Sequence, residues 1–168
     1  ASPVQWAGPR RLMDPALPLN ALPPLDVVLL SHNHYDHLDS SAVKWIAREH
    51  PRTTWIVPLG LGAFIRRCGG REVIELDWWQ QVTTSDCRVT ATPARHFSAR
   101  SLHDRNRSLW CGYAVEVHGW RAYFAGDTAH HPAFREIGAR CGPFDFVMIP
   151  IGAYDPRWFM RRFHVDPE

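Results

Sequence analysis

The sequence lacks several features that would assign a protein to a class at once. Its 168 residues contain a single lysine, Lys44, and 19 basic residues against 17 acidic ones leave a formal net charge of +2. Nucleic-acid-binding proteins usually show a basic excess or a Lys/Arg run, so this balance argues against nucleic acid as a partner. No stretch approaches the roughly 18 apolar residues of a transmembrane helix. We therefore expect a globular chain that does not span a membrane.

Cysteine is scarce and scattered. Cys68, Cys87, Cys111 and Cys141 form no C-x-x-C pair and lie far apart in the chain. We expect reduced thiols in a reducing compartment, so that the protein is cytoplasmic or peripheral to a membrane, although one disulfide pair stays an alternative. The chain also lacks a secretory signal and does not begin with Met, which predicts a processed chain or a fragment.

The pattern that is present is that of one domain in which strands alternate with helices. Hydrophobic residues make up 45% of the chain, enough for one core. The proline-rich stretch 1–24 predicts a long surface connection. Strands are predicted at 27–30 (buried on both faces), 53–57, 72–76, 88–92, 113–117, 121–125 and 145–149, and helices at 41–50, 59–70 and 132–142. This order predicts an α/β protein whose sheet is covered by helices.

The stretch SHNHYDHLD, at 31–39, directly follows the first predicted strand. Side chains at positions i and i+2 of an extended chain point the same way, so His32 and His34 should project together. Asp36 and His37 follow where the chain must turn before the next helix. Imidazole and carboxylate ligands suit zinc, and also iron or manganese. One loop can thus supply ligands to two metal ions.

Two metal ions need more ligands than this loop holds. His96 in TPARHFS and Asp127 in YFAGDT each follow a predicted strand, and Gly126 frees the turn before Asp127. Strand ends that open onto a common rim are where such sites form. Taken alone, His96 is as typical of a structural histidine as of a metal ligand, and G-D-T is a weak motif. Both support a metal site only because they occur together with the motif at 31–39.

Two other features allow both a structural and a functional interpretation. Asp39 should either cap the helix predicted at 41–50 or orient a ligand imidazole. The segment DPRWFMRRFH mixes aromatic residues with three arginines that would suit a lipid phosphate or an anionic bilayer. For this segment we favour the structural interpretation, in which Trp158 and Phe159 pack into the core.

The motif H-x-H-x-D-H, followed by a distant histidine and a G-D strand end, resembles the signature of the metallo-β-lactamase superfamily. Over nearly the whole chain the sequence is similar to N-acyl-phosphatidylethanolamine-hydrolysing phospholipases D and their bacterial relatives, in stretches that include ASPVQWAGP, VPLGL, VIELDWW, FAGDT, IPIGAYDPRWFM and HVDPE. The resemblance implies an αββα sandwich in which 1–168 form one partial domain. We expect it to lack the family's N-terminal strands and its C-terminal part.

The resemblance also implies a ligand set for two zinc ions. By this resemblance His32, His34 and His96 would bind the first ion. Asp36 and His37 would bind the second ion, and Asp127 would bridge the two ions. In the family the second ion takes one more histidine from an HWG-like segment, which we expect beyond Glu168. We expect His164 to lie near the substrate. The alternative is that His164 is the missing ligand of the second ion.

The activity implied is that of a zinc-dependent phosphodiesterase of phospholipase D type. Such an enzyme splits an N-acyl-phosphatidylethanolamine-like lipid through a hydroxide held between two zinc ions, and Asp36 and Asp127 would be the catalytic carboxylates. The partner would be a phospholipid or another small molecule, with peripheral membrane contact. Two alternatives stay open: a hydrolase of this fold that acts on another ester, lactone or phosphate, and an inactive metal-binding fragment.

Overall fold

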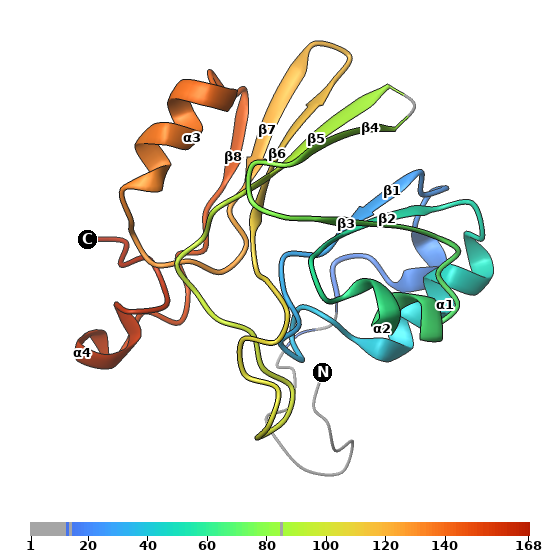
Figure 1. The fold of residues 1–168 in the computed structure, drawn as a ribbon, viewed down its shortest axis with the longest axis horizontal. Coiled ribbons are helices and arrows are strands. Elements are labelled where there is room, and N and C mark those ends of the chain that lie inside the picture. The colour runs from blue at the N-terminus through green and yellow to red at the C-terminus, as the bar shows by residue number, and fades with distance from the viewer. Residues whose placement is uncertain (1–12, 14, 85) are drawn as a thin grey trace.

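The protein is described from a computed structural model that covers residue 13, residues 15–84 and residues 86–168. Part of the predicted surface connection 1–24 lies outside these residues, as does the ASPVQWAGP stretch. Figure 1 shows the arrangement of the elements, which in chain order are η1 (Leu19–Ala21, a 3₁₀ helix), β1 (Val27–Leu29), α1 (Ser40–Glu49), β2 (Thr54–Pro58), α2 (Gly62–Arg67), β3 (Glu72–Leu76), β4 (Gln81–Thr84), β5 (Cys87–Thr92), β6 (Gly112–Val117), β7 (Trp120–Phe124), α3 (Ala133–Cys141), β8 (Phe146–Met148) and α4 (Arg157–Met160).

The strands form two sheets. β1, β2 and β3 pair in parallel in that order, with Val28 opposite Trp55 and Trp55 opposite Val73. The second sheet has the order β4-β5-β6-β7-β8, and its pairs are antiparallel except for the parallel pair β7–β8. A parallel pair needs a crossover connection, and α1, α2 and α3 supply it after β1, β2 and β7.

Three groups of buried apolar side chains hold four layers together. Side chains alternate along β2, so Trp55 and Val57 pack with α1 and α2 while Ile56 packs with residues of the second sheet. The third group joins Tyr123 of β7 to Ile137 of α3. In Figure 1, α1 and α2 flank the first sheet and α3 flanks the second. The architecture is the αββα sandwich that the resemblance implied.

The strands of the structure differ from the predicted ones in two ways. β4 was not predicted, because its four residues QVTT contain a single aliphatic side chain; it forms through antiparallel pairing with β5. The strand at the start of the histidine motif was predicted to be buried on both faces. Its three residues, Val27–Leu29, are only half-buried, and within the described part of the chain β1 pairs with β2 alone.

The expectation that Trp158 and Phe159 pack into the core is wrong. Their exposed fractions are 74% and 50%. Both lie on α4, a single turn that is too short to bury one face against another element. Among the described residues no helix combines the length and the apolar character needed to cross a bilayer.

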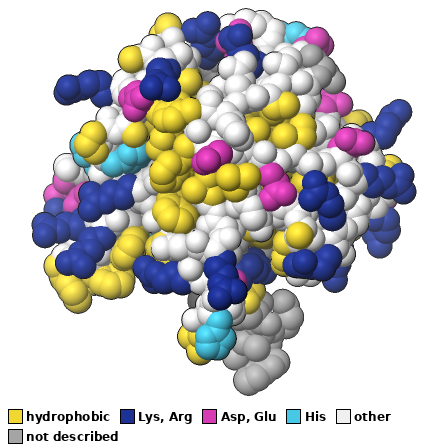
Figure 2. Space-filling view, in the orientation of Figure 1, with side chains coloured by type: hydrophobic (Ala, Val, Ile, Leu, Met, Phe, Trp, Pro, Cys, Tyr) yellow, Lys and Arg dark blue, Asp and Glu magenta, His cyan; other side chains and the backbone are white. Residues whose placement is uncertain are grey.

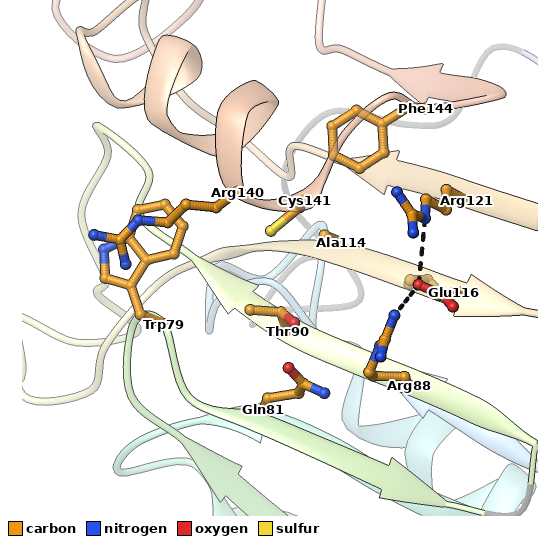
Figure 3. Close-up of a pocket in the computed structure, with 11 residues that line it drawn as sticks. Trp79, Gln81, Arg88, Thr90, Ala114, Glu116, Arg121, Arg140, Cys141 and Phe144 are labelled. Atoms are coloured by element: carbon orange, nitrogen blue, oxygen red, sulfur yellow. Dashed lines mark hydrogen bonds and ion pairs between the residues drawn. The ribbon is translucent and has the colours of Figure 1, made fainter.

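A hollow of about 350 Å³ lies between α3 and the outer face of the second sheet, and several arginines line it (Figure 3). Glu116 forms ion pairs with both Arg88 and Arg121. The guanidinium group of Arg140 lies 4.4 Å from the centre of the Trp79 ring, a cation–π contact. The charges in this hollow therefore have partners within the chain, and the Arg140–Trp79 contact ties α3 to the turn before β4.

Candidate metal centre

The strand ends bring the histidine motif, His96 and Asp127 to one place. The motif follows β1, His96 follows β5, and Asp127 follows β7. β1 lies in one sheet and β5 and β7 lie in the other, so the site is assembled across both sheets. It forms where the strands of the two sheets end, as expected for side chains that share a rim.

Three imidazoles form the first group of possible ligands. The ligand atoms of His32, His34 and His96 all lie within 4.8 Å of one another. Nδ1 of His34 is 2.9 Å from Nε2 of His32 and 3.2 Å from Nε2 of His96. The period-two argument for His32 and His34 therefore holds, and His96 joins them from a position 62 residues further along.

A second group combines His32, His37 and Asp127. Oδ2 of Asp127 lies 3.1 Å from Nε2 of His37, and 3.9 Å and 3.8 Å from Nε2 of His32 and His96. One carboxylate oxygen thus faces imidazoles of both groups.

The remaining two predicted site residues lie at the edge. The side chain of Asp36 is 73% exposed, and its Oδ2 is 3.6 Å from Nε2 of His37. Asp36 belongs to neither group, whereas His32 belongs to both. The ring of His164 lies 5.3 Å from that of His96, centre to centre, and lines the adjoining cavity.

Two groups that support the imidazoles were not anticipated. The hydroxyl of Ser31 lies 3.0 Å from Nδ1 of His32, and the carbonyl oxygen of Phe163 lies 3.1 Å from Nδ1 of His96. When each Nδ1–H donates to its partner, Nε2 is left with a lone pair that faces the centre. Ser31 begins the motif and could have been noticed there. Phe163 could not, since a backbone carbonyl has no sequence signature.

Asp39 caps α1. Its Oδ1 accepts hydrogen bonds from the backbone N–H of Ser41 at 2.7 Å and of Ala42 at 3.3 Å. These are donors of the first helical turn, which have no partner within the helix. The structure therefore shows Asp39 as a helix cap, which is the structural interpretation.

Burial and charge set the protonation of the centre. Burial lowers the pKa of His32 to about 2 and that of His96 to about 4, and it also lowers the pKa of His34. Burial alone would raise the pKa of Asp127, but the hydrogen bond and charge of His37 lower it to about 2. For His37, burial acts downward, yet the hydrogen bond with Asp127 raises its pKa.

This donor set fits a metal ion. The lowered pKa values of His32, His34 and His96 favour neutral imidazoles, and that of Asp127 favours an ionised carboxylate. These are the protonation states that ligate divalent cations. Three ring nitrogens face one point, since Nδ1 of His34 is 2.9 Å from Nε2 of His32 and 3.2 Å from Nε2 of His96. Each neutral imidazole has one nitrogen lone pair that can bind a cation. Nitrogen and oxygen ligands of this kind suit zinc, iron and manganese.

A cavity of about 290 Å³ opens beside the centre. His34, His96 and Asp127 form its polar end, and the other wall is mainly apolar, formed by Phe97, Phe159, Met160 and Phe163. Most of the apolar wall comes from α4 and the residues that follow it. A molecule bound here would place a polar group at the ligands and an apolar part against the aromatic rings.

Comparison with known proteins agrees with this geometry. Residues 1–168 match the family described as the Beta-lactamase superfamily domain. The chain is 43% identical over 178 residues to the Caenorhabditis elegans protein named N-acyl-phosphatidylethanolamine-hydrolyzing phospholipase D 1, covering 100% of this chain and 50% of that protein. It is 37% identical over 169 residues to the Saccharomyces cerevisiae protein named N-acyl-phosphatidylethanolamine-hydrolyzing phospholipase D, mitochondrial, covering 96% of this chain and 36% of that protein.

Among solved structures, CmlA, a diiron β-hydroxylase from Streptomyces venezuelae, matches with a TM-score of 0.62 at 26% identity, over 86% of this chain and 32% of that one. The chain thus spans half or less of the length of these relatives. The match over all 168 residues, together with the histidine motif at the rim of an αββα sandwich, shows that the chain belongs to the β-lactamase superfamily and has the metallo-β-lactamase fold.

Proposed function

We propose that the protein is a metal-dependent hydrolase, and specifically a phosphodiesterase of phospholipase D type that acts on N-acyl-phosphatidylethanolamine-like lipids. The observation that carries the proposal is the convergence of four imidazoles and one carboxylate beside a cavity with an apolar wall. The names of the worm and yeast relatives support the reaction, although this chain spans only part of each.

We assign two metal ions to the centre, with zinc as the proposed metal. His32, His34 and His96 would hold the first ion, Asp36 and His37 the second, and Asp127 both. Iron is the alternative, because the same donor types serve it and CmlA is described as a diiron protein. When bound, such a pair supplies an activated water at neutral pH and stabilises negative charge on phosphoryl oxygens.

The chain's own residues orient the reacting groups. Ser31 and the Phe163 carbonyl hold the rings of His32 and His96 in one orientation. Asp127 stays ionised because its pKa is about 2, so it can face several imidazoles without a change of protonation. His164, on the cavity wall beside His96, is placed to donate a hydrogen bond to a substrate phosphate.

The cavity dimensions suit one part of a lipid. At about 290 Å³ it lies at the lower end of the size range of small-molecule pockets and cannot enclose a whole phospholipid. We propose that the phosphate end enters while the acyl chains remain outside, beyond Phe159. This arrangement requires the mouth of the cavity to face the lipid phase.

The α4 segment supports peripheral membrane contact. Trp158 and Phe159 are exposed next to the cavity, and Arg161 and Arg162 are exposed just after them. Figure 2 shows yellow apolar and dark blue basic side chains side by side at the lower left, where Figure 1 places α4. Aromatic and arginine side chains together suit the interface of an anionic bilayer.

The proposal is tested with the full protein and two substrate classes. Release of an N-acylethanolamine is measured on vesicles that contain N-acyl-phosphatidylethanolamine, and hydrolysis of soluble esters, lactones and phosphates is measured in parallel. We expect preference for the lipid, loss of activity on chelation and recovery with zinc. Preference for a soluble substrate would indicate another hydrolase of this fold, and metal binding without turnover would indicate a non-catalytic metal protein.

A further inference from the structure

The turn that carries the metal-binding motif is held by an arginine from another loop. Arg100 follows His96 and lies 67 residues beyond Asn33. Its Nη1 donates hydrogen bonds to the carbonyl oxygens of Asn33 at 2.9 Å and of Leu38 at 2.7 Å. These carbonyls stand just before and just after the turn 34–37. One nitrogen therefore ties the two ends of the turn together.

Stacking and a return hydrogen bond add to this contact. The guanidinium carbon of Arg100 lies 4.1 Å from the centre of the Tyr35 ring and 5.1 Å from the centre of the Phe64 ring. The hydroxyl of Tyr35 donates to the carbonyl oxygen of Arg100 at 2.8 Å. Tyr35 lies within the motif, between His34 and Asp36. The motif and the Arg100 loop thus hold each other through side chain and backbone.

The loop that carries Arg100 is itself anchored. Oδ1 of Asp104 accepts hydrogen bonds from the backbone N–H of Arg100 at 2.9 Å and of Ser101 at 2.7 Å. At the base of the loop, the hydroxyl of Ser98 donates to the carbonyl oxygen of Ser108 at 2.6 Å. Arg100 therefore projects from a closed, internally bonded loop, which gives its side chain a fixed starting point.

We propose that Arg100 is a positioning residue for the metal centre. It keeps the turn 34–37 in the conformation in which His34 and His37 face the ligands from the second sheet. Asn33 and Leu38 are 5% and 0% exposed, and a methionine at position 100 would occupy much of the arginine's space without a donor for their carbonyls. Unpaired carbonyls favour rearrangement of the turn, and with it the two imidazoles move.

This inference rests on the metal-binding part of the proposed function and not on the substrate. The test is metal affinity of the full protein, measured by competition with a chelator for Zn²⁺ and by the absorption spectrum of the Co²⁺ form. Arg100→Met should weaken binding by roughly 10- to 100-fold, the usual cost of removing a group that orients ligands, and should change the Co²⁺ spectrum. Arg107→Met, an exposed position of the same loop, is the matched control and should leave both unchanged.

A conservative variant separates positioning from general stabilisation. An ammonium group has several N–H donors and can serve both carbonyls, but it lacks the planar stacking surface. Arg100→Lys should therefore bind metal more tightly than Arg100→Met. If Arg100→Met does not fold, Tyr35→Phe provides the second test: loss of its hydrogen bond to Arg100 should weaken binding several-fold in a folded protein.

Two results would overturn the inference. In the first, Arg100→Met has lower thermal stability without metal but its affinity and Co²⁺ spectrum match those of Arg107→Met, so that Arg100 only stabilises the fold. In the second, Arg100→Met does not fold and Tyr35→Phe binds metal like the unaltered protein. If the unaltered protein binds no metal at all, the proposed function fails and the inference fails with it. If the unaltered protein binds metal and the variants give either of the two results above, only the inference fails.

Discussion

Gly126 approaches Ser31 so closely that there is no room for a side chain at position 126. A β-carbon there would lie 2.7 Å from Cβ of Ser31 and 3.1 Å from the carbonyl oxygen of Cys111. The residue also has a φ of +61°, a left-handed conformation that glycine adopts at low cost. This contact joins the residue before Asp127 to the residue before His32, so it brings candidate ligands of the two sheets together.

Gly126→Ala should therefore damage both stability and the metal centre. Strain at positive φ and the close contact together should lower the free energy of unfolding by roughly 2–5 kcal/mol. Metal affinity should fall as well, because Asp127 is displaced. Gly119 is the matched control: its φ is +83°, but a β-carbon there has nothing within 4 Å. Gly119→Ala should lower the free energy of unfolding only by the cost of backbone strain, and it should leave metal affinity unchanged. Equal losses of stability and metal affinity in Gly119→Ala and Gly126→Ala would contradict this account.

Asp127→Asn should remove metal and activity together. The substitution keeps the shape but removes the charge that faces His32, His37 and His96. Metal affinity and lipid hydrolysis should drop by more than the roughly 10- to 100-fold that loss of an outer supporting group costs, and metal content per chain should fall. Asp36→Asn, at the exposed edge, should weaken the binding of the second ion only. Unchanged metal content in Asp127→Asn would exclude the bridging role.

Substitutions at Asp39 separate capping from ligand orientation. Asp39→Ala removes the acceptor for the N–H groups of Ser41 and Ala42, and should cost about 1 kcal/mol of unfolding free energy. Asp39→Asn keeps an acceptor and should have little effect, because asparagine is as good an N-cap. Denaturant unfolding and metal titration measure the two effects. A fall in metal affinity in Asp39→Asn would restore the orienting role.

Alkaline pH should destabilise the fold through the buried thiol of Cys111. Burial raises the pKa of Cys111 from 9.0 to about 12. The thiol has a higher pKa in the folded state than in the unfolded state. Its contribution to the free energy of unfolding is therefore complete below pH 9 and is lost as the pH rises toward 12. The loss is roughly 4 kcal/mol over that window, at about 1.4 kcal/mol for each pKa unit.

The measurement is denaturant unfolding at several pH values with a chelator present. Burial likewise raises the pKa of Tyr123 from 10.0 to about 12, so some pH dependence should persist without the thiol. Cys111→Ala should make the decline in unfolding free energy above pH 9 shallower. The slopes are compared, since the substitution itself shifts stability at every pH. Identical slopes would show that the thiol does not contribute.

Local chain geometry explains which parts of the site were predictable. The period of two places His32 and His34 on one side whatever the rest of the chain does. Asp39 caps a helix that begins beside it, and Gly126 relieves a turn at its own position. By contrast, β4 is formed by its pairing with β5 and has little pattern of its own. The exposure of Trp158 depends on which surfaces are available nearby, and its amphipathic ring suits either environment.

The sequence by itself determined the turn glycine, the donor types of the candidate metal centre and, through the motif, the family. Only the tertiary structure decided that both sheets contribute candidate ligands, that Asp36 lies at the exposed edge, and that Arg100 ties the ends of the turn across 67 residues. The physical reason is that local features depend on the backbone geometry of a few neighbouring residues. Contacts between distant segments depend instead on how two sheets pack over a shared apolar core, which no short stretch of sequence specifies.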